Sequence, residues 1–137
     1  MRQLTHPELW IGTAGDVRNP GALASCGIAA VVDLALNELP IAPSREIVFC
    51  RFPLVDGPGN APWLLRAAVE MTAMLIRSQV RTLIVCGAGM SRSPAIAAMA
   101  LAAATGQPAE DYLWEIAQSG PIDVSPGLWS ELCLVCG

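Results

Sequence analysis

Residues 82–106 constrain the fold more than any other part of the chain. The run TLIVC (82–86) is apolar after its first residue, Thr82, and the alanine-rich segment PAIAAMALAAAT (94–105) follows it after a short loop. A strand without a polar face has to be buried on both sides, which is typical of a parallel sheet covered by helices. We therefore expect this strand to be central and the following segment to be a helix that ends at Gly106.

Short apolar runs and helical segments alternate along the rest of the chain, a pattern that predicts an α/β fold with a mainly parallel central sheet flanked by helices. At 137 residues the chain suits one domain, residues 1–137, better than two. The predicted strands are ELWIGTA (8–14), IAAVVDLA (28–35) and EIVFCRFPL (46–54). The predicted helices begin at Asn19, Asn60, Ala109 and Ser125, where Asn19, Asn60 and Ser125 are suited to cap them.

Composition limits the possible partners and the compartment. The net charge is −4, and all eight basic residues are arginines without a cluster, so we expect no nucleic-acid partner. No apolar run is long enough to span a membrane, and the first residues lack the apolar core of a secretion signal. The odd number of cysteines indicates reducing conditions, so we expect a soluble cytoplasmic protein; they are Cys26, Cys50, Cys86, Cys133 and Cys136.

The segment VCGAGMSRSP (85–94) carries the chemistry that the sequence suggests. Cys86 ends the predicted central strand and Arg92 precedes the helix, with the loop GAGMS between them. Backbone N–H groups of such a loop, above a helix N-terminus, form a cradle for an anion. Gly87 and Gly89 would supply positive φ angles and close approach. That positive field would favour the thiolate of Cys86, and the planar guanidinium of Arg92 could hold two phosphate oxygens.

A phosphoryl transfer to sulfur also needs an acid that protonates the leaving oxygen. Asp56 lies in the loop VDGPGN (55–60), after the predicted strand 46–54, and ligand sites of α/β sheets lie at such strand ends. Asp33 lies within an apolar strand and Asp16 in a distant turn, so both are poorer candidates. An Asp-Gly turn without a catalytic purpose is the alternative interpretation of Asp56.

These residues resemble the dual-specificity branch of the cysteine-dependent protein tyrosine phosphatases. That family has a loop of the form His-Cys-x-x-Gly-x-x-Arg-Ser/Thr, often with AGxSRS, and this chain has CGAGMSRS. The segments LWIGTAGDVRNPGALASCGIAAVVDLA (9–35) and FPLVDGPG (52–59) are similar to the N-terminal part and the general-acid loop of the family. The resemblance covers nearly the whole chain.

The resemblance implies a phosphatase that hydrolyses phosphate monoesters through a phosphocysteine, without a metal or another cofactor. It implies Cys86 as the nucleophile, Arg92 as the phosphate clamp, and Asp56 as the acid and then the base. It implies that Ser93 donates a hydrogen bond to the cysteine sulfur. The implied phosphate loop consists of Gly87, Ala88, Gly89, Met90, Ser91 and Arg92, and the implied substrate is a phosphorylated protein or a small phosphate ester.

Three alternatives stay open at this point. Val85 stands where the family has histidine, which is compatible with a non-catalytic phosphate-binding module. A rhodanese-type sulfurtransferase also uses a cysteine in a loop at a strand end, but it has no use for Asp56. Ser93, ahead of Pro94, is equally suited to an ordinary helix N-cap.

The CxxC pair Cys133 and Cys136 fits helix packing better than metal or redox chemistry, because no second pair is present.

Overall fold

The computed structural model describes all 137 residues and contains one five-stranded sheet of order β1-β2-β5-β3-β4. Strands β2, β5, β3 and β4 are parallel, and β1 pairs antiparallel with β2. The expected mainly parallel sheet with a central strand 82–86 is thus confirmed. The strands are β1 Arg2–Gln3, β2 Leu9–Thr13, β3 Ala30–Asp33, β4 Val48–Arg51 and β5 Thr82–Cys86.

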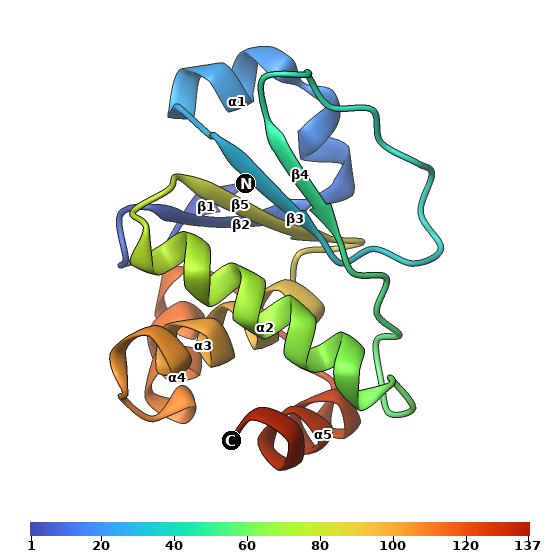
Figure 1. The fold of residues 1–137 in the computed structure, drawn as a ribbon, viewed down its shortest axis with the longest axis vertical. Coiled ribbons are helices and arrows are strands. Elements are labelled where there is room, and N and C mark those ends of the chain that lie inside the picture. Colours follow the sequence, from blue (N-terminus) through green and yellow to red (C-terminus); the bar gives the residue numbers. More distant parts are fainter.

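Helices cover both faces of the sheet, as Figure 1 shows. The short 3₁₀ helix η1 (Ala14–Arg18) and α1 (Pro20–Cys26) lie on one face. The other four helices lie on the opposite face, where α3 contacts α2, α4 and α5. They are α2 (Pro62–Arg77), α3 (Arg92–Thr105), α4 (Ala109–Ser119) and α5 (Pro126–Cys136).

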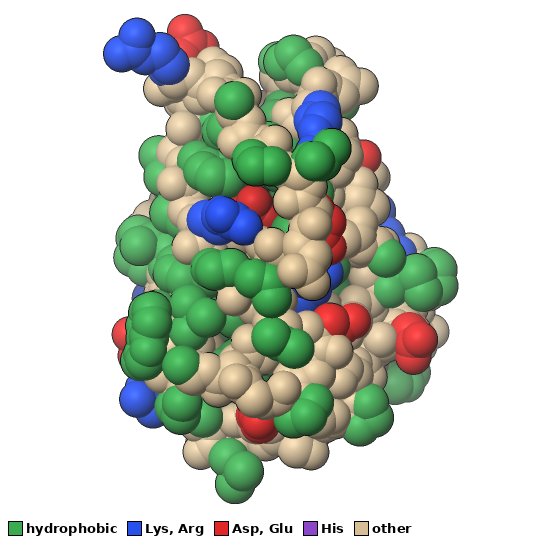
Figure 2. Space-filling view, turned by 90° about the vertical axis from the view of Figure 1, so that its right-hand side faces the viewer, with side chains coloured by type: hydrophobic (Ala, Val, Ile, Leu, Met, Phe, Trp, Pro, Cys, Tyr) green, Lys and Arg blue, Asp and Glu red, His purple; other side chains and the backbone are tan.

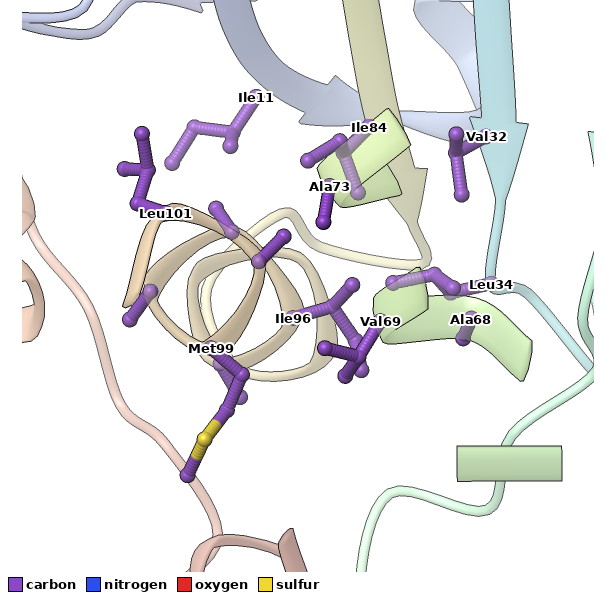
Figure 3. Close-up of a cluster of buried hydrophobic side chains, with 14 of the residues drawn as sticks. Ile11, Val32, Leu34, Ala68, Val69, Ala73, Ile84, Ile96, Met99 and Leu101 are labelled. Carbon is purple, nitrogen blue, oxygen red and sulfur yellow. The ribbon is translucent and has the colours of Figure 1, made fainter. Parts of the chain in front are cut away.

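The apolar character of β5 follows from its position between two hydrophobic cores. Ile84 and Cys86 point toward the larger core, which lies between the sheet and helices α2 and α3. Figure 3 shows Ile84 there beside Ile11 of β2 and Val32 of β3. Leu83 and Val85 belong to the second core on the α1 side. Val85 is fully buried on the face opposite to Cys86, so an apolar side chain at this position contributes to packing.

Most predicted helix ends are confirmed, and one cap is wrong. Asn19 Oδ1 accepts a hydrogen bond of 3.1 Å from the Ala22 amide, and Ser125 Oγ accepts one of 3.4 Å from the Leu128 amide. Gly106 ends α3 in the left-handed conformation, with φ 82°. Asn60 does not cap α2, whose N-cap is Ala61.

The side chain of Asn60 instead closes the 55–60 loop. Its amide oxygen accepts a hydrogen bond of 2.8 Å from the Val55 amide, and its Nδ2 donates to the Val55 and Gly57 carbonyls at 2.9 and 3.2 Å. These hydrogen bonds occupy the side-chain amide of Asn60, whose oxygen would otherwise be available to cap α2. Such a side chain to backbone bridge is a common alternative for asparagine in turns.

The helical spacing of the apolar residues Leu64, Ala67, Ala68, Met71 and Leu75 predicts that they form the buried face of α2, and the observed face is rotated from this one by about one residue. Of the predicted set, Leu64, Ala67 and Met71 are only half-buried, whereas Ala68 and Leu75 are buried. The shift arises because α2 packs against the small side chains of α3 as well as against the sheet. The buried residues of α2 are Leu65, Ala68, Val69, Thr72, Ala73, Leu75 and Ile76.

Candidate active site

The candidate site lies where the carboxyl ends of the parallel strands meet. Cys86 is the last residue of β5, and α3 begins at Arg92, so the loop 87–91 lies at the N-terminus of that helix. Cys86 is 2% exposed. The strand, the helix and the loop are thus arranged as the sequence predicted. A helix N-terminus carries partial positive charge, which favours an anion in such a loop.

The two glycines of this loop are needed for different reasons. Gly89 has φ 70°, and a Cβ there would lie 2.8 Å from the Gly12 carbonyl oxygen of β2. Gly87 lacks the expected positive φ. A side chain at Gly87 would overlap the Glu38 carboxylate and lie 3.1 Å from Arg92 Nη2. The loop therefore packs closely against the end of β2 on one side and against the segment after β3 on the other.

The backbone amides of the loop are free to bind an anion. The N–H groups of residues 87–91 make no hydrogen bond within the protein. Gly87 is half-buried and Gly89 and Ser91 are buried, and backbone amides at such positions are normally paired within the protein. Successive amides of this kind form an anion-binding concavity.

Arg92 is buried at the start of α3, and its guanidinium is held from two sides. Its Nη1 donates hydrogen bonds to the carbonyl oxygens of Leu54 at 3.0 Å and Leu34 at 3.4 Å. Its Nη2 donates a hydrogen bond of 2.9 Å to Glu38 Oε1, which is also an ion pair. Its Nε is buried without a partner. The guanidinium therefore lies across the ends of β3 and β4, with one donor unused.

Asp56 contacts the same loop from the segment after β4. Its Oδ1 accepts a hydrogen bond of 2.5 Å from Ser91 Oγ. Ser91 Oγ in turn accepts a hydrogen bond of 2.9 Å from the amide of Ser125, the N-cap of α5. The Asp56 residue is otherwise exposed. Ser91 is therefore the point at which the 55–60 loop, the 87–91 loop and α5 meet.

Helix α5 and the residues before it contact both loops. The amide of Asp123 donates a hydrogen bond of 2.7 Å to the Met90 carbonyl. The amide of Gly59 donates one of 2.7 Å to Glu131 Oε1 on α5. These bonds fix the two loops relative to each other, although they are about 30 residues apart in the chain.

Ser93 is fully buried within the first turn of α3, and its Oγ has no hydrogen-bond partner. The residue is not the N-cap, because α3 already begins at Arg92 and Ser91 precedes it. The interpretation of Ser93 as a cap is therefore wrong. The hydrogen bond to Cys86 that the resemblance implies is not formed in this structure, so the role of Ser93 stays a prediction.

Two carboxylates near the guanidinium have shifted pKa values of opposite direction. Burial raises the pKa of Glu38, but the hydrogen bond from Arg92 and its charge outweigh this, so the pKa is below its usual value. Burial also raises the pKa of Asp33, and here it prevails over the hydrogen bond from the Ala35 amide and the charge of Arg51. Glu38 is therefore anionic at neutral pH, whereas ionised Asp33 is disfavoured.

The remaining cysteines lie away from this loop. Cys133 and Cys136 are half-buried free thiols on α5, and Cys50 lies on β4. Burial raises the thiol pKa of Cys50, and it also raises those of Cys133 and Cys136. Such thiols are poorer nucleophiles at neutral pH. No group of three or more His, Cys, Asp or Glu side chains is arranged to hold a metal ion.

Three residues of the site were missed in the sequence, namely Glu38, Ser91 as a contact of Asp56, and Ser125. Glu38 follows β3, so its position at the carboxyl edge of the sheet was a usable signal. Ser125 was recognised only as a helix cap. Its contact with Ser91 depends on how α5 packs, and nothing local in the sequence indicates that contact.

Figure 2 looks onto the side of the molecule that carries β4 and the segments after β3 and β4, at the carboxyl edge of the sheet. Acidic and basic side chains are interspersed there among apolar ones.

None of the helices combines the length and the apolar character needed to cross a membrane.

Comparisons with known proteins identify the fold. No protein-family model and no curated protein sequence matches the chain. Human DUSP28 superposes with a TM-score of 0.82 at 22% identity, covering 94% of this chain and 91% of that one. A mouse putative dual-specificity phosphatase complexed with zinc tungstate gives a TM-score of 0.81 at 22% identity, covering 95% of this chain and 82% of that one.

A third solved structure is the human tyrosine phosphatase-like serine/threonine/tyrosine-interacting protein. It gives a TM-score of 0.80 at 18% identity, covering 93% of this chain and 90% of that one. The chain therefore has the fold of the dual-specificity phosphatases, as the sequence resemblance implied.

Proposed function

We propose that the chain is a cysteine-dependent phosphatase of the dual-specificity type, which hydrolyses phosphate monoesters. The observation that carries the proposal is the hydrogen bond between Ser91 and Asp56. It joins a carboxylate to the loop that links Cys86 and Arg92. A rhodanese-type sulfurtransferase has no use for such a carboxylate, so this contact favours the phosphatase.

In the first step, the phosphate of the ester binds to the amides of residues 87–91 and to Arg92. The thiolate of Cys86 attacks phosphorus, and the bond between phosphorus and the ester oxygen breaks. Asp56 in its acid form gives a proton from Oδ2 to that oxygen, while Oδ1 keeps the hydrogen bond from Ser91. The products are the free alcohol or phenol and a phosphocysteine.

In the second step, Asp56 is a carboxylate and takes a proton from water as the water attacks phosphorus. The bond between phosphorus and sulfur breaks, and Cys86 leaves as a thiolate. Inorganic phosphate is released. The buried hydroxyl of Ser93, which has no partner in the protein, is the donor that we assign to the leaving sulfur.

The proposed substrate class is phosphotyrosine, phosphoserine and phosphothreonine in proteins, by analogy with proteins of this fold, and the proposed location is the cytoplasm. The test is release of phosphate from an aryl phosphate in the presence of EDTA, with and without vanadate. The variant Cys86→Ser should lose turnover, and Cys50→Ser, which removes another thiol, should keep it. Anion binding without turnover in the wild type would instead indicate a phosphate-binding module.

A further inference from the structure

The hydrogen bond between Glu38 and Arg92 has no role in the proposed reaction. Glu38 lies on the segment between β3 and β4, which contains no helix or strand. Its Oε1 accepts a hydrogen bond of 2.9 Å from Arg92 Nη2 and lies over the first residue of the loop, Gly87. A carboxylate of the chain therefore occupies space next to the loop amides where a phosphate oxygen would bind.

Arg92 does not depend on Glu38 for its orientation. The carbonyl oxygens of Leu34 and Leu54 hold Nη1 on the other side of the guanidinium. The donors that remain for a phosphate are Nε, which is buried without a partner, and Nη2, which Glu38 occupies. A bidentate contact between phosphate and the Nε–Nη2 edge therefore competes with Glu38 for a donor.

Glu38 contacts the guanidinium of Arg92 through only one of its carboxylate oxygens. Its Oε2 is buried and has no hydrogen-bond partner, so only one of its two oxygens contributes. A phosphate offers three oxygens to the same arginine and to the loop amides. The segment that carries Glu38 is exposed and held by few hydrogen bonds. Leu39 is 76% exposed and its carbonyl accepts one bond of 3.0 Å from Arg18, and the bonds from Arg51 to the carbonyls of Ala35 and Leu36 are long, at 3.4 and 3.5 Å. A carboxylate on such a segment can be displaced.

We propose that Glu38 is an internal competitor that occupies Arg92 in the free protein and leaves it when a phosphate ester binds. This proposal rests on the phosphate site of the proposed function and adds a regulation of its affinity. Small free anions such as sulfate or inorganic phosphate then bind weakly, because they must displace a charged hydrogen bond. Esters gain further binding from the rest of the molecule, so the site favours them over free phosphate.

The experiment measures sulfate binding by isothermal titration calorimetry at pH 7, because sulfate is a tetrahedral dianion that is not turned over. The proteins are the wild type, Glu38→Gln and the control Glu46→Gln, which removes the same charge from the same segment away from Arg92. Glu38→Gln should bind sulfate about tenfold more tightly than the wild type. Glu46→Gln should match the wild type.

The bound sulfate is located by its protection of Cys86 against alkylation by iodoacetamide, followed by peptide mass spectrometry. The sulfate concentration that halves the alkylation rate should fall by the same factor in Glu38→Gln. Glu38→Ala, which also removes the amide that glutamine retains, should show a change in the same direction.

The possible outcomes bear on the competition alone or on both proposals. Unchanged or weaker sulfate binding in both Glu38 variants overturns the competition and makes Glu38 a positioning residue for Arg92. Tighter binding in these variants, together with an absence of turnover in the wild type, supports the competition and overturns the phosphatase. No sulfate binding in any folded variant, checked by circular dichroism, overturns both.

Discussion

Ser91 Oγ donates a hydrogen bond of 2.5 Å to Asp56 Oδ1, and it accepts one from the Ser125 amide at the same time. One hydroxyl thus connects the two loops of the candidate site to the start of α5. A serine hydroxyl that uses both its donor and its acceptor in this way fixes the position of the carboxylate, while the backbone amide of the same residue stays free for the phosphate. This relationship leads to the first two predictions.

Asp56→Asn should lower turnover about 100-fold or more, because asparagine cannot protonate the leaving oxygen. The loss should be smaller for p-nitrophenyl phosphate than for an alkyl phosphate, since nitrophenolate leaves without a proton more easily. Steady-state kinetics with both esters provide the measurement. The control Asp111→Asn changes an exposed carboxylate on α4 and should leave both rates unchanged. Equal losses with the two esters would argue against an acid role.

Ser91→Ala should reduce turnover while most of the fold is kept. The substitution releases Asp56 and leaves the part-buried Ser125 amide without its partner, which costs about 1 kcal/mol, the lower end of the range for buried donors. Thermal unfolding and the kinetic constants give the two readouts. Ser25→Ala, which removes a hydroxyl bonded to Gly21 on α1, is the matched control and should not change turnover. A variant with wild-type kinetics would show that Asp56 does not need Ser91.

Gly89→Ala should be more harmful than Gly106→Ala, although both glycines have a positive φ, of 70° and 82°. A Cβ at Gly89 would contact the Gly12 carbonyl oxygen at 2.8 Å, whereas a Cβ at Gly106 would meet no atom within 4 Å. The backbone strain of about 1 kcal/mol is common to both, so the difference measures the contact alone. Chemical denaturation and sulfate binding are the measurements. Similar losses in both variants would contradict the close packing of the loop on β2.

Asp33→Asn should raise the thermal stability at pH 7 relative to the wild type. Because burial raises the pKa of Asp33 in the folded protein, the unfolded chain releases the proton at a lower pH. The wild type therefore loses stability as the pH rises from the unfolded value through the folded one, and the loss persists above it. Asparagine can still accept the hydrogen bond of 2.9 Å from the Ala35 amide.

The advantage of Asp33→Asn should disappear below about pH 4, near the pKa of an aspartate in an unfolded chain. Thermal unfolding at pH 3.5 and pH 7 checks this. If the variant were less stable at pH 7, the ion pair with Arg51, whose Nε lies 3.9 Å from Asp33 Oδ2, would outweigh the burial of the charge.

The fold could be predicted from the sequence where the signal is local. The apolar run 83–86 indicates a strand that is buried on both faces, and Asn19, Gly106 and Ser125 mark helix ends by their own chemistry. The cap assigned to Asn60 was wrong because its side chain bonds to the loop before it. The choice between two such partners is made by the three-dimensional path of the chain, which no short pattern contains.

The candidate site could be predicted in part for the same reason. Cys86 and Arg92 belong to one contiguous motif, and Asp56 lies in a loop at the expected edge of the sheet. The contacts of Ser91 with Asp56 and Ser125, and of Glu38 with Arg92, join segments more than 30 residues apart. They depend on the exact course of irregular segments, for which periodicity and propensity give no information.

The hydrogen bonds from Gly59 to Glu131 and from Asp123 to Met90 connect α5, and the residues before it, to the loop of Asp56 and to the loop after Cys86. A small sliding of α5 along its axis would alter the separation of acid and nucleophile, with every reacting group unchanged. Substitutions on the outer surface of this helix, remote from any bound ester, would therefore be able to tune the speed of the reaction.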